Sequence, residues 1–234
     1  MQCVILCAGK GTRLRPITES VPKPLIQVYG APILEHIVKA LPSEIDEIIL
    51  VVSYLKEKII ETCGSNYFGK KVIYCEQQNP AGGTGDALMC TKKVLHGKFL
   101  LLNGDDIYGA SMLKQAVSYD SMIFGYYSKT PEKFGVLVSN SDGTLNKIIE
   151  KPANPTSNHI NIGGYVLNDS IFTYEMPISP SGEIYVTDMV TEFAKNNKVQ
   201  IVEQDLWIPI GYPEDIEKAE KILAAISSVA VEVK

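Results

Sequence analysis

Short apolar runs alternate with amphipathic stretches along the first half of the chain. The apolar runs predict strands at residues 2–7, 47–53, 72–75, 99–103 and 122–127. The stretches between them predict helices at residues 33–40, 55–63, 84–95 and 111–118. Strands that are apolar on both faces are typical of a parallel sheet that helices cover on each side.

The second half of the chain has a different pattern. Strands are expected at 135–139 and 145–150, and Asn140-Ser141-Asp142-Gly143 between them is a hairpin signal. Strands at 162–167 and 199–203 and helices at about 187–195 and 213–226 follow. We expect an α/β fold: a single Rossmann-like three-layer domain with a mostly parallel sheet and a small antiparallel insertion over the sheet's carboxyl edge. Ligands of such sheets bind outside the carboxyl ends of the strands.

The segment after the first strand combines glycines with cations. Gly9 and Gly11 lack Cβ atoms, so backbone N–H groups there can approach phosphate oxygens. An ordinary strand-to-helix turn also favours glycine, so the glycines alone leave both interpretations open. The spacing fits neither the P-loop nor the Rossmann fingerprint. Arg13 and Arg15 add planar, multi-donor cations that are suited to phosphate.

Two further residues suit a polyphosphate and its metal. Lys23 lies between Pro22 and Pro24, so its flexible charge is mounted on a stiffened segment. Asp105 follows the buried strand at 99–103, where a Mg²⁺ ion that bridges phosphates needs a carboxylate. The simpler interpretations are a solvated loop lysine and an aspartate that caps a turn.

Charge and composition limit the class of partner. The net charge is −5 and no basic stripe exists, which argues against nucleic-acid binding, so local cations must meet any anionic substrate. Five cysteines without a C-x-x-C pattern predict reduced thiols in a cytoplasmic protein. The three scattered histidines suggest no zinc site. We expect no signal peptide and no membrane span, since every apolar run is shorter than about 18 residues.

The opening segment resembles a known family signature. The matching motif is Gly9-x-Gly11-Thr12-Arg13-Leu14-x-Pro16-x-Thr18, followed by Pro22-Lys23-Pro24-Leu25. It is similar to that of the sugar-phosphate nucleotidyltransferases (NDP-sugar pyrophosphorylases such as glucose-1-phosphate thymidylyltransferases and uridylyltransferases). These enzymes join an NTP and a sugar 1-phosphate into an NDP-sugar and pyrophosphate. The resemblance implies that Arg13 and Lys23 are catalytic and that the nucleotide lies on Leu6, Ala8, Gly9, Gly11 and Thr12.

A second segment resembles the part of the family that reads the base. A glutamine, a four-residue spacer and Gly83-Thr84 precede a helix. A glutamine amide offers a donor beside an acceptor, which matches the imide edge of uracil or thymine. Counting back from Gly83 gives this role to Gln78, and Gln77 takes it if the loop register differs. The resemblance also implies that Asp105 is the ligand of a Mg²⁺ cofactor.

Four later segments follow the order of the family's sugar-binding half. They are Phe134-Gly135-Val136, Ile149-Glu150-Lys151-Pro152, Asn161-x-Gly163-x-Tyr165 and Gly182-Glu183-x-x-x-Thr187-Asp188. The resemblance assigns the hexose hydroxyls to Gly135, Glu150, Asn161 and Glu183, and the sugar's phosphate to Lys151. A surface ion pair at 150–151 and a helix cap at 183 are the simpler alternatives. The predicted nucleotidyltransferase domain covers 1–234, with a nucleotide-binding half (about 1–110), a sugar-binding half (about 111–215) and the C-terminal helix.

One position departs from the family pattern. In the family, a Trp-x-Asp-x-Gly segment carries a second metal-binding aspartate. In this sequence the segment is Trp207-Ile208-Pro209-Ile210-Gly211, so Pro209 takes the place of that aspartate. Mg²⁺ often needs only one or two carboxylates when phosphates and water complete its coordination. Asp105 therefore acts alone or with Asp106 or Asp205. Glu214 and Asp215 are better explained as acidic residues of a helix's first turn.

The resulting hypothesis is a Mg²⁺-dependent sugar-1-phosphate nucleotidylyltransferase, with UTP or dTTP favoured and a hexose 1-phosphate as acceptor. The expected partners are these two substrates, with no nucleic acid and no membrane, and the oligomeric state is open, a homo-oligomer included. Two rival functions stay open: cytidylyl transfer to a non-sugar phosphate, and a degenerate NDP-sugar-binding regulatory homologue that lacks activity.

Overall fold

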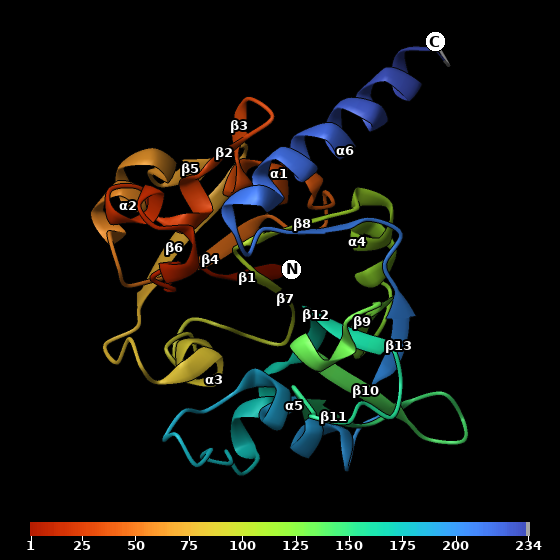
Figure 1. The fold of residues 1–234 in the computed structure, drawn as a ribbon. Helices are drawn as coiled ribbons and strands as arrows, with labels where there is room; N and C mark the ends of the chain where they lie inside the picture. Colours follow the sequence, from red (N-terminus) through yellow and green to blue (C-terminus); the bar gives the residue numbers. More distant parts are fainter. Residues whose placement is uncertain (233–234) are drawn as a thin grey trace.

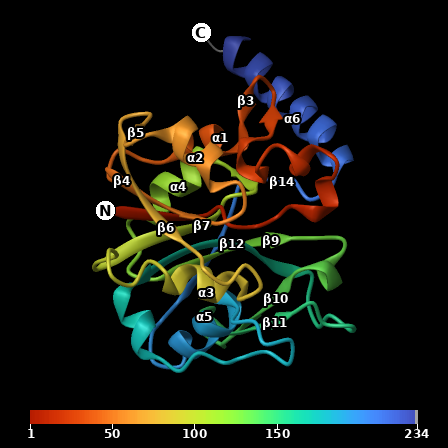
Figure 2. The same cartoon turned by 90° about the vertical axis from the view of Figure 1, so that its left-hand side faces the viewer.

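A ten-stranded sheet lies between two layers of helices in the computed structural model, which describes residues 1–232 and the side chains up to residue 228 (Figure 1, Figure 2). The centre of the sheet is parallel. Its strands follow the order β7 (Lys98–Asn103), β1 (Gln2–Leu6), β4 (Glu47–Val52) and β6 (Lys70–Glu76). The short β5 (Asn66–Tyr67) pairs antiparallel with β6 at the edge.

The two faces of the sheet carry separate hydrophobic cores because neighbouring side chains of a strand point to opposite faces. In β1, Cys3 and Ile5 belong to one core and Val4 belongs to the other. The first core packs against α1 (Ile33–Ala40), α2 (Lys56–Cys63) and α4 (Ala110–Ala116). The second packs against α3 (Gly83–Met89) and α5 (Val186–Ala194). This arrangement confirms the predicted three-layer α/β fold.

The antiparallel strands of the second half extend the same sheet instead of forming a separate insertion. β12 (His159–Asn168) pairs antiparallel with β7 and also contacts β9 (Met122–Tyr127) and β10 (Gly135–Ser139). β11 (Leu145–Glu150) forms the predicted hairpin with β10, and β13 (Gln200–Glu203) runs parallel to β9.

Two short strand pairs were not predicted from the sequence. β8 (Asp106–Tyr108) pairs with β14 (Trp207–Pro209), and β2 (Gln27–Val28) pairs with β3 (Ala31–Pro32). The helix predicted for 84–95 ends at Met89, after which the chain continues in turns.

Within residues 1–232, the remaining helices are one long helix and five short ones. α6 (Pro213–Glu232) starts beside the first helical layer and extends past the body of the molecule (Figure 1). The short 3₁₀ helices are η1 (Thr12–Leu14), η2 (Ile17–Glu19), η3 (Lys23–Leu25), η4 (Pro131–Lys133) and η5 (Asp169–Thr173). None of the helices in the described part of the chain has the length and apolar character needed to cross a membrane. All five cysteines are free thiols.

Candidate active site

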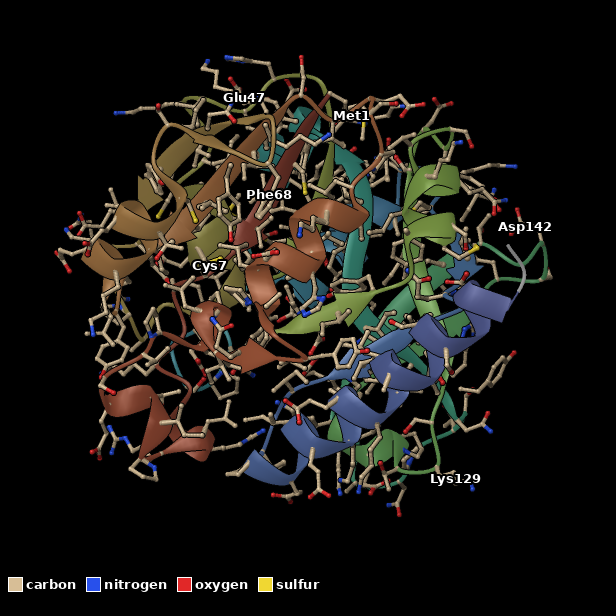
Figure 3. The ribbon with its side chains drawn as sticks, turned by 90° about the horizontal axis from the view of Figure 1, so that it is seen from above. Met1, Cys7, Glu47, Phe68, Lys129 and Asp142 are labelled. Atoms are coloured by element: carbon tan, nitrogen blue, oxygen red, sulfur yellow. The ribbon has the colours of Figure 1, made fainter. Side chains whose placement is uncertain are left out.

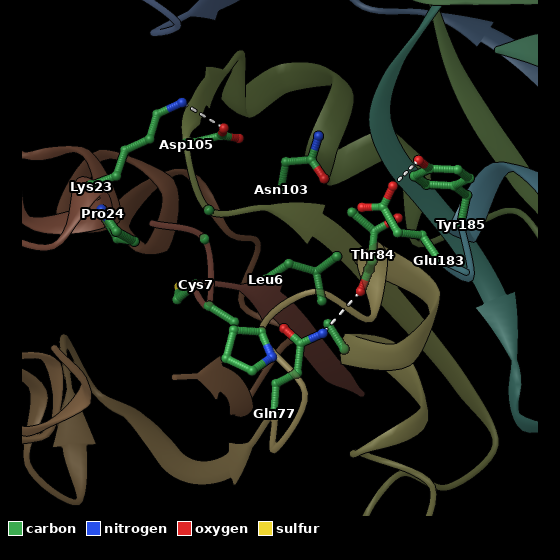
Figure 4. Close-up of a pocket in the computed structure, with 16 residues that line it drawn as sticks. Leu6, Cys7, Lys23, Pro24, Gln77, Thr84, Asn103, Asp105, Glu183 and Tyr185 are labelled. Carbon is green, nitrogen blue, oxygen red and sulfur yellow. Dashed lines mark hydrogen bonds and ion pairs between the residues drawn. The ribbon is translucent and has the colours of Figure 1, made fainter. Parts of the chain in front are cut away.

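Two cavities adjoin at the carboxyl ends of β1 and β7. The first lies between these strand ends, the start of α3 and the segment that precedes α5 (Figure 4). Its walls are small or apolar residues with a few polar groups: Leu6, Cys7, Ala8, Gly9, Lys23, Pro24, Gln77, Pro80, Gly83, Thr84, Ala87, Asn103, Gly104, Asp105, Glu183 and Tyr185. Few charges and much bare backbone suit a nucleoside more than a hexose.

The second cavity is more polar and lies toward β10, β11 and β12. It combines charged side chains with an aromatic wall: Leu6, Arg13, Lys23, Thr84, Asn103, Asp105, Asp106, Lys133, Phe134, Gly135, Glu150, Lys151, Asn161, Ile162, Gly163, Tyr165, Tyr185, Val186, Thr187, Trp207, Pro209, Ile210 and Gly211. Six residues line both cavities: Leu6, Lys23, Thr84, Asn103, Asp105 and Tyr185. The two cavities therefore meet at the expected catalytic lysine and metal ligand.

Close backbone contact brings Asp105 to this junction. The Gly104 N–H donates to the Leu6 carbonyl oxygen at 3.0 Å, and a Cβ on Gly104 would lie only 2.6 Å from that oxygen. A side chain at position 104 would force the ends of β1 and β7 apart, so glycine is needed there.

Lys23 reaches the same point from η3. Its Nζ lies 2.6 Å from Asp105 Oδ2, and the Lys23 side chain is only 13% exposed, against 41% for Asp105. Gly11 has a left-handed φ of 59°, and a Cβ on it would lie 3.2 Å from the Lys23 Cβ. Gly11 thus gives Lys23 room to lie along the loop, although Gly11 itself lines neither cavity.

The start of α3 is tied to the chain before α5. The Gly85 N–H donates to the Ile184 carbonyl oxygen (2.7 Å), and the Ile184 N–H donates to that of Gly82 (2.8 Å). The Thr84 Oγ1 accepts from the Val186 N–H at 3.0 Å. These contacts bring Gly83 and Thr84 from the first half of the chain against Glu183 and Tyr185 from the second.

The structure distinguishes the two glutamines before this loop. Gln77 is buried and lines the first cavity, whereas Gln78 is exposed and lines neither cavity. Strand alternation explains the difference, because Cys75 and Gln77 point to the same side of the chain that leaves β6. The Gln77 Nε2 donates to the Gly83 carbonyl oxygen (3.0 Å) and to Asp86 Oδ2 (2.9 Å). These two hydrogen bonds fix the plane of the amide.

A bulge in β12 orients the buried Asn161. The Asn161 Nδ2 donates to the Tyr165 hydroxyl at 2.7 Å, and its Oδ1 accepts from the Gly163 N–H at 3.0 Å. Gly163 has a φ of 74°, and a Cβ on it would overlap the Asn103 side chain. Burial raises the pKa of Tyr165, so this hydroxyl stays protonated.

Glu150 ends β11 and Lys151 follows it, and both line the second cavity. The Lys151 Nζ lies 3.3 Å from Glu150 Oε1, and Lys151 has a left-handed φ of 41°. Its N–H donates to the Phe134 carbonyl oxygen at 3.0 Å, which holds the chain in this conformation. Gly135 lies opposite Glu150, where a Cβ would lie 3.2 Å from Glu150 Oε2.

Glu183 lines the first cavity and not the second, although the sequence assigns it to the sugar. Its Oε2 accepts from the Tyr185 hydroxyl and from the Ser181 hydroxyl, the latter at 2.8 Å. These hydrogen bonds, that of Tyr185 first, lower the pKa of Glu183. The carboxylate is therefore ionised near the junction of the two cavities.

Asp106 is the second carboxylate at the junction. It is buried, and its Oδ2 accepts from the Trp207 Nε1 at 3.1 Å. Burial, and then the like charge of Asp105, raise the pKa of Asp106 to about 8. The β8–β14 pairing places Pro209 directly opposite Asp106.

Asp205 lies away from both cavities and accepts from the Ser111 hydroxyl. Asp215 accepts from the Gly211 and Tyr212 N–H groups at 3.1 and 2.9 Å, in agreement with its expected place in the first turn of α6.

The donor set at the junction fits a hard divalent cation. Asp105, Asp106 and the Asn103 amide offer oxygen donors, which Mg²⁺ prefers. Within the described residues no group of three or more His, Cys, Asp or Glu side chains could hold a metal, so phosphate and water would have to complete the coordination.

The structure brings most of the predicted site residues to the two cavities. Gly11, Thr12, Arg15 and Gln78 line neither cavity. Arg13 lines the second, with its guanidinium carbon 5.5 Å from the centre of the Tyr212 ring. The sequence analysis missed Asn103, Tyr185 and Lys133. Asn103 ends a predicted strand, which is the one signal that could have identified it.

Comparisons with known proteins identify the family to which the sequence is similar. The sequence pattern of the family described as nucleotidyl transferase matches residues 2–225. The bifunctional protein GlmU of Methanocaldococcus jannaschii is 39% identical over 95% of this chain and 54% of its own length. The UTP–glucose-1-phosphate uridylyltransferase AglF of Haloferax volcanii is 32% identical over 99% of this chain and 100% of its own.

A solved structure has a similar fold. It is a Bacillus anthracis protein, assigned as a glucose-1-phosphate thymidylyltransferase and crystallised with sucrose, with a TM-score of 0.84 and 25% identity over 95% of each chain. The chain spans about half the length of the GlmU relatives that it matches.

Proposed function

The chain belongs to the nucleotidyl transferase family, and from this premise we propose that it is a sugar-1-phosphate nucleotidylyltransferase. It transfers a nucleotidyl group from an NTP, with UTP or dTTP favoured, to a hexose 1-phosphate and releases pyrophosphate. The observation that carries this proposal is the junction of the two cavities at Lys23 and Asp105. A nucleotide in the first cavity and a sugar phosphate in the second would bring their phosphates together there.

The preference for UTP or dTTP rests on Gln77. Both amide hydrogens of Gln77 have protein acceptors, Gly83 and Asp86, so its Oε1 is the group left for a base. An acceptor at this point matches the imide N–H of uracil or thymine. The name of the Haloferax volcanii relative, a UTP-dependent uridylyltransferase, supports the same choice.

The preference for a hexose rests on the second cavity. Glu150 offers carboxylate oxygens and Asn161 a fixed amide, and Lys151 is the cation beside them. Sugar hydroxyls donate to such acceptors, and a phosphate monoester needs a cation. A cationic, hydroxyl-free acceptor such as phosphocholine would use none of the hydroxyl contacts.

The chemistry follows from positioning and charge. A sugar phosphate oxygen attacks the α-phosphorus of the NTP in line, and pyrophosphate leaves. The nucleophile is already ionised, so the protein supplies no general base. Lys23 and Arg13 would stabilise the charge on the transferred phosphoryl group. Asp105 and Asp106 would hold Mg²⁺, which when bound neutralises the triphosphate.

The test is pyrophosphate release by the purified protein. Glucose 1-phosphate or N-acetylglucosamine 1-phosphate is supplied with each of UTP, dTTP, CTP, GTP and ATP, in Mg²⁺ or in chelator. Metal-dependent release with UTP or dTTP supports the proposal. Release from CTP with phosphocholine as the acceptor, and with neither sugar phosphate, would favour cytidylyl transfer to a non-sugar phosphate. If no combination releases pyrophosphate but the protein still binds an NDP-sugar, the result would favour a degenerate binding protein. Pro209, in place of the second metal-binding aspartate, is the feature that motivates this alternative.

A further inference from the structure

Lys133 is a lysine of the second cavity that the sequence signature does not contain. It ends η4 and lines the cavity beside Phe134. No ion pair involves Lys133 among the residues whose side chains the structure describes. Its ammonium group is therefore available to a ligand.

The other cations of this cavity already have partners. Lys23 pairs with Asp105 at 2.6 Å and Lys151 pairs with Glu150 at 3.3 Å. Arg13 lies over the Tyr212 ring. A ligand phosphate must compete with Glu150 for Lys151, whereas it has no carboxylate competitor at Lys133.

The backbone places Lys133 and Lys151 at the same end of the β10–β11 hairpin. The Phe134 carbonyl oxygen accepts from the Lys151 N–H at 3.0 Å, so the chain immediately after Lys133 is bonded to Lys151. Pro131 and the hydrogen bond from the Lys133 N–H to the Thr130 carbonyl oxygen (3.2 Å) fix the turn that carries Lys133. The two lysines thus approach one cavity from adjacent segments.

We infer that Lys133 is a further binding residue for the phosphate of the acceptor and that it acts together with Lys151. The inference rests on the proposed function, since it concerns the sugar-phosphate side of the same site. A phosphate monoester carries close to two negative charges near neutral pH, and one lysine that is shared with Glu150 neutralises it incompletely. Lys133 supplies the missing positive charge.

The simpler interpretation is that Lys133 is an ordinary solvated lysine, and the chain offers a matched control for it. Lys129 lies four residues earlier and is also exposed, at the edge of the molecule in Figure 3. It lines neither cavity. The two lysines have the same charge and both are exposed in the segment that connects β9 to β10. They differ in their access to the second cavity.

The experiment compares Lys133→Met, Lys133→Arg and Lys129→Met with the wild type in pyrophosphate release from glucose 1-phosphate and UTP. In Lys133→Met we expect the KM for glucose 1-phosphate to rise about tenfold, with kcat and the KM for UTP within about twofold of wild type. Lys133→Arg should keep most of the affinity, and Lys129→Met should match the wild type. The difference should shrink as salt is raised, since the lysine is exposed.

Calorimetric binding of glucose 1-phosphate separates this inference from the proposed function. One outcome is that the wild type turns over and that Lys133→Met and Lys129→Met have equal KM values for glucose 1-phosphate. This outcome would overturn the role of Lys133 and leave the proposed function standing. Another outcome is that the wild type shows no turnover but binds glucose 1-phosphate, and that Lys133→Met binds it more weakly. This outcome would overturn the proposed function and support the role of Lys133. No binding by the wild type would overturn both.

Discussion

The Lys23 ammonium and the Asp105 carboxylate are bound to each other, with Nζ 2.6 Å from Oδ2. The proposed function assigns the first group to a phosphate and the second to a metal ion. Binding of a phosphate by Lys23 and of a metal ion by Asp105 would each require this ion pair to open. The Lys23 ammonium group would therefore compete with a metal ion for the Asp105 carboxylate.

Replacing Lys23 by methionine should separate its two effects. Turnover should fall by about 100-fold or more, because the variant lacks the charge that we propose stabilises the transferred phosphoryl group. The affinity of the nucleotide-free protein for Mn²⁺ should rise by about tenfold, because no ammonium competes for Asp105. Steady-state kinetics and Mn²⁺ titration by electron paramagnetic resonance measure the two changes. Lys10→Met is the control, since Lys10 is exposed and lines neither cavity. Unchanged turnover in Lys23→Met would remove Lys23 from the mechanism.

Asp106 is the carboxylate best placed to compensate for Pro209. It lines the second cavity and lies opposite Pro209, whereas Asp205 lies outside both cavities. Asp106→Asn should weaken Mn²⁺ binding in the presence of UTP by about tenfold, because asparagine, unlike the Asp106 carboxyl group, cannot give up a proton and become a charged ligand when the metal binds. The asparagine Oδ1 can still accept from Trp207, so the local structure should persist.

The compensating change is Pro209→Asp. In the Asp106→Asn background it should restore most of the Mn²⁺ affinity, since it returns a carboxylate to the facing position. Asp205→Asn is the matched control and should bind Mn²⁺ as the wild type does. Equal affinity in Asp106→Asn and Asp205→Asn would show that Asp105 needs no second carboxylate.

Gln77 and Gln78 form a second matched pair. Gln77→Ala should raise the KM for UTP by about tenfold, because it removes an acceptor in the first cavity and the amide that braces Gly83. Gln78→Ala should leave the KM for UTP unchanged, since Gln78 is exposed outside the cavity. Kinetics with UTP and CTP measure both the affinity and the choice of base. The opposite result would return the base-reading role to Gln78.

The sequence predicted the elements whose signals are local. The runs at 122–127, 135–139 and 145–150 became β9, β10 and β11 with the expected bounds, because their apolar and turn residues are contiguous. β8 and β14 gave no such signal. Each has three residues, and their pairing joins Asp106 to a partner about a hundred residues away.

The cavity that some predicted site residues line depends on contacts that motif spacing does not reveal. Whether Gln77 or Gln78 faces the cavity depends on the alternation at the end of β6, and motif spacing leaves that register open. Glu183 lines the first cavity because Ile184 bonds to the loop before α3, a contact that spans about a hundred residues. Lys133 belongs to no motif, and only the folded structure shows that it lines the second cavity.

Gly83 combines a left-handed backbone conformation with close contact to the segment before α5. It has a φ of 84°, and a Cβ on it would lie 2.5 Å from the Ile184 carbonyl oxygen. Gly143 has nearly the same φ, 82°, but a Cβ there would have no heavy atom within 4 Å. Both alanine variants incur the left-handed strain of about 1–2 kcal/mol. Only Gly83→Ala also pushes apart the segments that Gly82, Gly85 and Ile184 join.

We therefore expect urea unfolding to give Gly83→Ala a further loss of about 1–3 kcal/mol beyond that of Gly143→Ala, with equal m-values. Because the same segments line the first cavity, the KM for UTP should rise in Gly83→Ala and stay unchanged in Gly143→Ala. Equal losses of stability would mean that the loop before α3 relaxes away from Ile184 at little cost. In that case the contact between the two halves of the chain would not be what holds Thr84 and Glu183 on the same cavity.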